Sequence, residues 1–183
     1  SEFTRFIVNL KIEELSEPVV SHARDCLLDY LGVAIAGAHD PRDRAMGAIS
    51  PILGFENGVR PIGSDQRLSP LGAVLVNGFS SHLLELDDDH RFAIYHPGSP
   101  VISSALVAAW GEDVDLGKLL EGIVAGYEVS VRVAELIQPG YRERGYHATG
   151  SCGAIGAASS VGKIIGLSEG DLRSALNLAT TLA

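Results

Sequence analysis

The chain has 183 residues, of which 46% are hydrophobic, and this length suffices for one domain over residues 1–183 with a sizeable core. Lys and Arg number 14 and Asp and Glu number 23, giving a formal net charge of −9. This charge argues against a nucleic-acid partner, because phosphate binding needs a basic surface. No uninterrupted apolar run reaches the ~18 residues that a membrane span requires, so we expect no membrane partner. Cys26 and Cys152 lie far apart without metal-ligand spacing, which favours a reducing compartment such as the cytoplasm.

The first part of the chain predicts two helices. The first begins after Ser16 as N-cap, with Pro18 in its first turn, and its apolar residues recur at spacings of three and four. The second, shorter helix covers residues 43–53 and is expected to end near Pro51. Residues 58–66 are rich in glycine, proline and polar residues, which predicts a loop with room for one short extended segment.

The rest of the chain predicts five more helices and no convincing strand pair. Ser69 is expected to cap a helix that runs to about Leu86, where a polar loop over residues 87–98 begins. The other four are expected over residues 99–110, 115–137, 149–167 and 168–183. Because the connections are short, neighbouring helices should run antiparallel. We therefore predict an all-α fold, a multi-helix bundle.

Residues 82–100 gather three histidines and four carboxylates in a chain that is otherwise mainly small and aliphatic. On a continued helix, His82, Glu85 and Asp89 would share one face. Consecutive aspartates at a helix C-terminus oppose the macrodipole, so a solvated acidic loop is only one interpretation. The same residues suit a metal site, an aspartate-rich Mg²⁺ motif for diphosphates, or metal-free chemistry in which a carboxylate holds a histidine.

A second polar cluster precedes a glycine-rich helix start in residues 140–158. Arg142, Arg144 and His147 stand directly before that helix, and the free N–H groups of residues 149–153 are expected to form an anion site. A capped helix beside a solvated arginine loop is the simpler alternative. Taken together, one acidic and one basic cluster, each with a histidine, favour a pocket for a carboxylate substrate.

Four stretches of the chain resemble the MmgE/PrpD family in order and spacing. They are "ARDCLLDYLGVAIAGA", "NGFSSHLLELDDDH", "HPGSPVISSALVAA" and "GYHATGSCGAIGAASSVGKIIGL". The resemblance covers essentially the whole chain. It implies a lyase or isomerase, such as a 2-methylcitrate dehydratase, a cis-aconitate decarboxylase or an iminodisuccinate epimerase. It also implies no metal or organic cofactor, a homodimer, and an all-helical domain beside a separate α/β lid domain.

The resemblance also implies roles for individual residues. His96 matches the histidine of the family's His-Pro motif and His147 the histidine before the glycine-rich helix, and these are the expected acid–base pair. Asp88 is expected to hold His96, so the predicted catalytic residues are His96, His147 and Asp88. The predicted substrate-binding residues are Glu85, Asp87, Asp89, Arg142, Arg144, Thr149, Gly150 and Ser151. Glu85 and Asp89 depart from the family, which usually has Asp and Thr at these positions, and this leaves the substrate open.

The chain ends before the family's downstream active-site lysine and before the lid. The first hypothesis is therefore the helical-domain portion of a lyase or isomerase that transfers a proton next to a carboxylate of a small di- or tricarboxylate. The second is a non-catalytic, truncated helical domain that self-associates. The third is a metal-dependent hydrolase that uses His82, Glu85, Asp89 and His96. The helix over 149–167 has small residues on most faces, so we expect it to be buried on several sides.

Overall fold

The computed structural model describes residues 1–182, and helices dominate it. The elements are α1 (Glu2–Asn9), the 3₁₀-helix η1 (Ile12–Glu14), α2 (Glu17–Ala38), α3 (Ala45–Leu53), β1 (Gly54–Val59), α4 (Pro70–His82), α5 (Gly98–Glu112), α6 (Leu116–Ile137), α7 (Gly140–Glu143), α8 (Ala148–Ile164) and α9 (Glu169–Leu182). The strand makes only isolated bridges to Leu68 within the described residues. The predicted all-α fold is confirmed.

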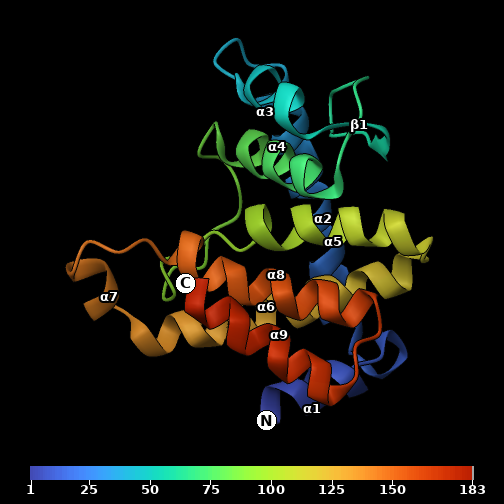
Figure 1. Ribbon diagram of the computed structural model, residues 1–183. Helices are drawn as coiled ribbons and strands as arrows, with labels where there is room; N and C mark the ends of the chain where they lie inside the picture. Colours follow the sequence, from blue (N-terminus) through green and yellow to red (C-terminus); the bar gives the residue numbers. More distant parts are fainter. Residues whose placement is uncertain (183) are drawn as a thin grey trace.

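The helices form three groups, and the long helix α2 passes behind them (Figure 1). α5, α6 and α8 lie across the middle, α3 and α4 lie on one side with β1, and α1 and α9 lie on the other. α2 passes behind and contacts α4, α5 and α6. The main core lies between α1, α2, α5, α6, α8 and α9. None of the helices within residues 1–182 combines the length and the hydropathy needed to cross a bilayer.

Small residues bring α6 and α8 close together. A Cβ atom on Gly126 of α6 would lie 2.9 Å from the carbonyl oxygen of Gly156 of α8, and one on Gly156 would lie 2.9 Å from Cβ of Ser130. Such a distance is shorter than van der Waals contact allows, so glycine is required at both positions. α8 also packs on α5 and α9, in line with the expectation that its small residues are buried on several sides.

Several helix ends differ from the prediction. α3 continues through Pro51 for two further residues, where the missing N–H disturbs only the last turn. α5 begins at Gly98 rather than after Ser99, because the Ser99 hydroxyl donates to the carbonyl of Gly78 on α4 instead of capping its own helix. The short helix α7 was not predicted. The end of α4 is the difference that matters most for the site.

Candidate functional site

The helix α4 ends at His82, four residues before the predicted end at Leu86. Glu85 adopts a positive φ of 53°, which reverses the chain direction, and its N–H donates to the carbonyl of His82. His82, Glu85 and Asp89 therefore do not share a helix face as the sequence suggested. Asp87 instead folds back toward the helix end.

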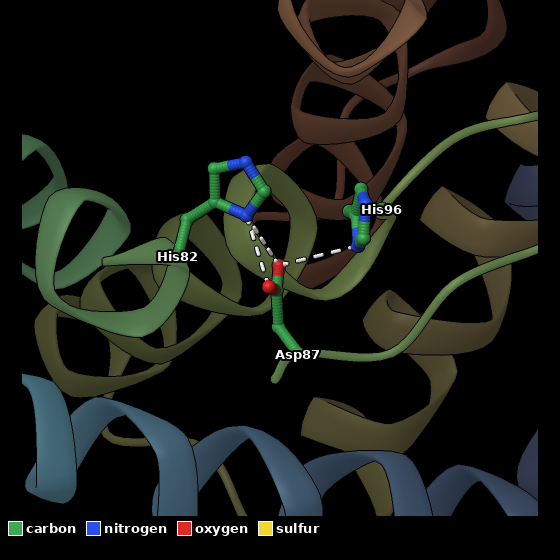
Figure 2. Close-up of side chains that lie close together, drawn as sticks. All are labelled: His82, Asp87 and His96. Carbon is green, nitrogen blue, oxygen red and sulfur yellow. Dashed lines mark hydrogen bonds and ion pairs between the residues drawn. The ribbon is translucent and has the colours of Figure 1, made fainter. Parts of the chain in front are cut away.

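The carboxylate of Asp87 joins two histidines (Figure 2). Its side chain is 1% exposed, and both of its oxygens lie 2.9 Å from Nδ1 of His82. Nδ1 of His96 lies 3.7 Å from the same carboxylate, and the two imidazole rings are 5.0 Å apart between centroids. A buried carboxylate between two imidazoles fixes their orientation and favours a proton on each Nδ1.

His96 is oriented by backbone as well. Its Nδ1 donates to the carbonyl oxygen of Asp88 at 2.9 Å, and its N–H donates to Oγ1 of Thr149 at the start of α8. A carbonyl oxygen can only accept, so the ring carries its proton on Nδ1. When the imidazole is neutral, Nε2 is then left with a free lone pair that can take up a proton.

Asp88 contacts the ring of His96 through its backbone carbonyl, whereas its carboxylate, the group expected to hold the histidine, is bonded elsewhere. Oδ1 of Asp88 accepts from the N–H of Gly98 at 2.9 Å, and Oδ2 accepts from the hydroxyl of Tyr127 at 2.7 Å. Asp87 and Asp88 are adjacent in sequence, yet their carboxylates face different neighbours. Burial raises the pKa of the Asp88 carboxyl.

An open cleft of about 860 Å³ brings the two polar clusters of the sequence together. His96 lines it from the loop after α4, and His147 lines it at the N-cap of α8. The imidazole of His147 lies 6.4 Å from that of His82 between centroids. Of the predicted site residues, the structure places Glu85, Asp87, Asp89, His96, Arg142 and His147 around this cleft. Their roles remain predictions.

Two of the N–H groups predicted to bind an anion are already hydrogen-bonded within the chain. The N–H groups of Gly150 and Ser151 both donate to the carbonyl of His147, and the hydroxyl of Thr149 accepts from the backbone of His96. The prediction extended these groups too far along the helix, because α8 begins at Ala148 and only the N–H groups of its first turn lack an intrahelical acceptor. Arg144 is exposed and is not among the residues that line the cleft. Arg142 is therefore the arginine that a bound anion can meet there.

Three side chains could hold a metal ion. Ligand atoms of His82, Asp87 and His96 lie within 4.8 Å of one another. The set differs from the predicted one, since Glu85 reaches only the far nitrogen of His82, at 3.6 Å, and Asp89 is outside the group. The Nδ1 proton that His96 donates to a carbonyl would have to be lost before that atom could bind a metal.

A small apolar cluster anchors the loop that carries His96. Ala93 and Tyr95 are fully buried against Ala134 of α6 and Cys152 of α8. The amide of Gln138 donates to the carbonyl of Ala93. Burial raises the pKa of the Cys152 thiol, which keeps it in the unreactive thiol form. Cys152 is therefore a packing residue beneath the site.

Sequence reasoning missed three residues of this arrangement. It assigned His82 only to the metal hypothesis, although a histidine five residues before a buried aspartate was a usable signal. It gave no role to Tyr127, which is 39 residues from Asp88 in sequence. It also missed Gln138. For these two, the sequence offers no local pattern that marks the contact.

Comparisons with known proteins agree with this architecture. The model of the MmgE/PrpD N-terminal domain matches residues 1–183. The cis-aconitate decarboxylase-like protein oryM of Aspergillus oryzae is 29% identical, with 100% of this chain and 40% of that protein aligned. The cis-aconitate decarboxylase of Aspergillus terreus is 29% identical, with 100% and 39% aligned, and that of Homo sapiens is 27% identical, with 99% and 39% aligned.

The chain thus spans about 40% of the length of the curated relatives that it matches. Its family follows from the model that matches every residue, together with the helical architecture that carries the two histidine motifs. This chain belongs to the MmgE/PrpD family and corresponds to the N-terminal domain of that family.

Proposed function

We propose that this chain supplies the histidine-bearing part of a lyase that acts on a small di- or tricarboxylate, with cis-aconitate as the first substrate to test. The observation that carries the proposal is the shared cleft, in which His96 and His147 stand with Arg142. The names of the relatives support the choice of substrate, because each of those three is named as a cis-aconitate decarboxylase or as like one.

The chemistry of such a reaction fits the groups in the cleft. When a C–C bond to a carboxylate breaks and CO₂ leaves, the electron pair spreads over the adjacent double bond of an unsaturated acid. A proton must then be added at the far carbon. A protonated imidazole can donate that proton through Nε2, and either His96 or His147 could serve. Arg142 could bind a second carboxylate through paired hydrogen bonds and offset the developing negative charge.

Buried Asp87 has a supporting role in this proposal. It holds His82 and faces His96 from a site that is closed to solvent. A carboxylate in this position stabilises an imidazolium while the ring is protonated, and it keeps Nε2 directed away from itself. The chain therefore contains the acid, the group that orients it and a cation for the substrate.

Histidine NMR on the chain itself tests the binding step. Titrating cis-aconitate into protein with ¹⁵N-labelled histidines should shift the ring signals of His96 and His147, whereas the signal of exposed His39 should stay in place. Replacing His96 with Gln should remove part of the response. Absence of any shift at both cleft histidines, in a folded protein, would contradict the proposal.

Arg142 and Arg144 form a matched pair for the substrate-binding step. We expect Arg142→Ala to weaken cis-aconitate binding by about tenfold or more, since a charge-assisted hydrogen bond contributes about 1.5–3 kcal/mol. Arg144→Ala should leave the affinity within about twofold, because Arg144 is exposed and does not line the cleft. Equal losses in the two variants would show that only the general charge of the loop matters.

A metal-dependent hydrolase is the second candidate, favoured by the three ligand atoms of His82, Asp87 and His96. Calorimetric titration with Zn²⁺ decides between the two. If the metal site exists, one Zn²⁺ should bind tightly per chain, and Asp87→Asn should abolish that binding. The lyase proposal predicts that carboxylate binding is unchanged by chelators.

A further inference from the structure

We propose that Tyr127 is a positioning residue for His96 and acts through Asp88. This inference deepens the proposed function, because it takes His96 as a group that moves a proton. It concerns the tautomer and the orientation of the ring. Tyr127 lies on α6, and in this arrangement it does not touch the substrate.

The carboxylate of Asp88 is held at both oxygens by separate elements. Tyr127 donates to Oδ2 from α6 at 2.7 Å, and the N–H of Gly98 donates to Oδ1 from the first residue of α5 at 2.9 Å. A Cβ atom at position 98 would lie 2.5 Å from Oδ1 of Asp88 and 3.2 Å from the hydroxyl of Tyr127. Only glycine at this position lets α5 approach the carboxylate closely enough for both bonds.

The backbone of the same residue then fixes the imidazole. The carbonyl oxygen of Asp88 accepts the Nδ1 proton of His96 at 2.9 Å. Rotation of the Asp88 residue would carry that carbonyl away from the ring. The two hydrogen bonds that the carboxylate of Asp88 accepts from Tyr127 and Gly98 resist such a rotation. The hydroxyl of Tyr127 therefore stabilises the Nδ1–H tautomer of His96 from the other side of the loop.

Burial makes the contribution of Tyr127 strong. The desolvation of Tyr127, with the nearby negative charge of Asp88 as a further cause, raises the pKa of the phenol well above its ordinary value. The hydroxyl therefore stays protonated and remains a donor. Removing it would leave one oxygen of a largely buried carboxylate without a donor, which is unfavourable enough to make the loop rearrange.

Replacing Tyr127 with Phe tests the proposal directly, because Phe keeps the ring and removes only the hydroxyl. The readout is the pair of ¹⁵N shifts of His96 at about pH 8, where a free imidazole is neutral. In the unmodified protein the two shifts should be far apart, as expected for a pure Nδ1–H tautomer. In Tyr127→Phe they should move toward each other as the Nε2–H form becomes populated.

Tyr30→Phe is the matched control for a general loss of stability. Tyr30 is fully buried, whereas Tyr127 is partly buried, and the hydroxyl of Tyr30 bonds Oγ of Ser103 at 2.6 Å. The Tyr30→Phe variant also loses one hydrogen bond of a tyrosine hydroxyl. Because Tyr30 does not bond Asp88, the ¹⁵N shifts of His96 should not move in this variant. Unchanged His96 shifts in a folded Tyr127→Phe protein would overturn the proposal.

Two substitutions of Asp88 keep the test decisive if Tyr127→Phe folds poorly. In Asp88→Asn the side chain can still accept from Gly98, and its NH₂ group can donate to the hydroxyl of Tyr127, so the Nδ1–H tautomer should be retained. Asp88→Ala should lose it. Retention in both variants would overturn the role of Asp88 and, with it, that of Tyr127.

The tautomer measurement needs no substrate, so it separates this inference from the proposed function. If His96 changes tautomer as described while cis-aconitate does not bind, the positioning role stands and the choice of substrate fails. If cis-aconitate binds while the tautomer is insensitive to both Tyr127 and Asp88, the proposed function stands and the positioning role fails.

Discussion

At the scale of single residues, the site is organised by two consecutive aspartates that face different neighbours. Asp87 points toward His82 and His96, and Asp88 points toward Tyr127 and the start of α5. The first is placed to act on imidazole rings and the second to hold the loop in place. A sequence shows both as one acidic motif, although their physical roles differ.

The burial of Asp88 predicts a pH-dependent effect on stability. Burial raises the pKa of Asp88 above its ordinary value of 3.8, so folding favours the protonated form. The contribution of this group is fully present below pH 3.8 and is lost as pH rises through the folded pKa. We therefore expect Asp88→Asn to increase the free energy of unfolding at pH 7 relative to the unmodified protein, with little difference near pH 4.

Urea unfolding at both pH values measures this effect, with Asp89→Asn as the control. Asp89 is exposed, so its substitution should change stability by less than about 0.5 kcal/mol at either pH. A loss of stability in Asp88→Asn at pH 7 would mean that the charged hydrogen bonds from Tyr127 and Gly98 outweigh desolvation.

At the scale of helices, the close contact between α6 and α8 depends on glycines, which have no side chain to separate the two backbones. We expect Gly126→Ala to lower the free energy of unfolding by about 1–3 kcal/mol, because the added Cβ would lie 2.5 Å from Val101 and 2.9 Å from the backbone of Gly156. Gly111→Ala is the control, since nothing lies within 4 Å of its added Cβ. That variant should gain up to about 1 kcal/mol from helix propensity. Thermal unfolding of both variants provides the comparison.

A buried lysine ties the N-terminal segment to α8. The ammonium group of Lys163 donates to the carbonyl oxygens of Val8 and Leu10 at the end of α1, and it lies 3.5 Å from the carboxylate of Glu121. Glu121 also accepts from the N–H of Ile12 in η1. Burial lowers the pKa of Lys163, and its hydrogen-bond partners offset part of that desolvation.

Lys163→Met should therefore destabilise the protein by about 3 kcal/mol, because the carbonyls of Val8 and Leu10 lose their buried cation and Glu121 loses one of its two lysines. Lys118→Met is the matched control, since Lys118 pairs with the same Glu121 at 3.2 Å but is partly exposed. Its loss should amount to less than about 1 kcal/mol. Similar losses in chemical denaturation would show that burial of Lys163 contributes nothing specific.

The beginnings of helices could be predicted from sequence, whereas the ends of helices near the site could not. Ser69 caps α4 through the N–H of Gly72, as predicted, and α6 begins at Leu116, one residue after the predicted start. The end of α4 depends on the contact of Asp87 with two histidines. The local helix propensity of residues 83–86 does not predict that contact.

Long-range hydrogen bonds limited the prediction of the site in the same way. The histidines and Arg142 could be found from motifs, and the cleft does bring them together. Tyr127, the partner of Asp88, could not be found from a motif, because in the sequence it resembles any other residue of an amphipathic helix. The bond that the hydroxyl of Thr149 accepts from the backbone of His96 is likewise a long-range contact that no rule about isolated helix starts anticipates.

At the scale of the whole molecule, apolar side chains remain exposed on two adjacent helices. Leu71, Leu75 and Phe79 form one stripe along α4, and Leu28 and Ile35 form one along α2, each at least 46% exposed. The spacings of four and seven residues place each set on a single helix face. Exposed stripes of this kind mark interaction surfaces in soluble proteins.

We therefore predict that the chain self-associates and that Leu71→Lys combined with Leu75→Lys weakens the association. Sedimentation at several protein concentrations should show a concentration-dependent mass for the unmodified chain and a monomer for the double variant. Leu178→Lys, at an exposed position of α9, is the control and should behave like the unmodified chain. A monomer at every concentration in the unmodified protein would refute the prediction.

The link between Lys163 and the end of α1 also sets an order of events during synthesis. The carbonyls of Val8 and Leu10 are separated from their lysine by 155 and 153 residues, so they leave the ribosome long before that partner exists. Until Lys163 emerges, α1 has only its local hydrogen bonds, and helices this short are marginal in water. Of these two partners, the one that is made earlier is therefore fixed in the folded protein only after the later one has emerged.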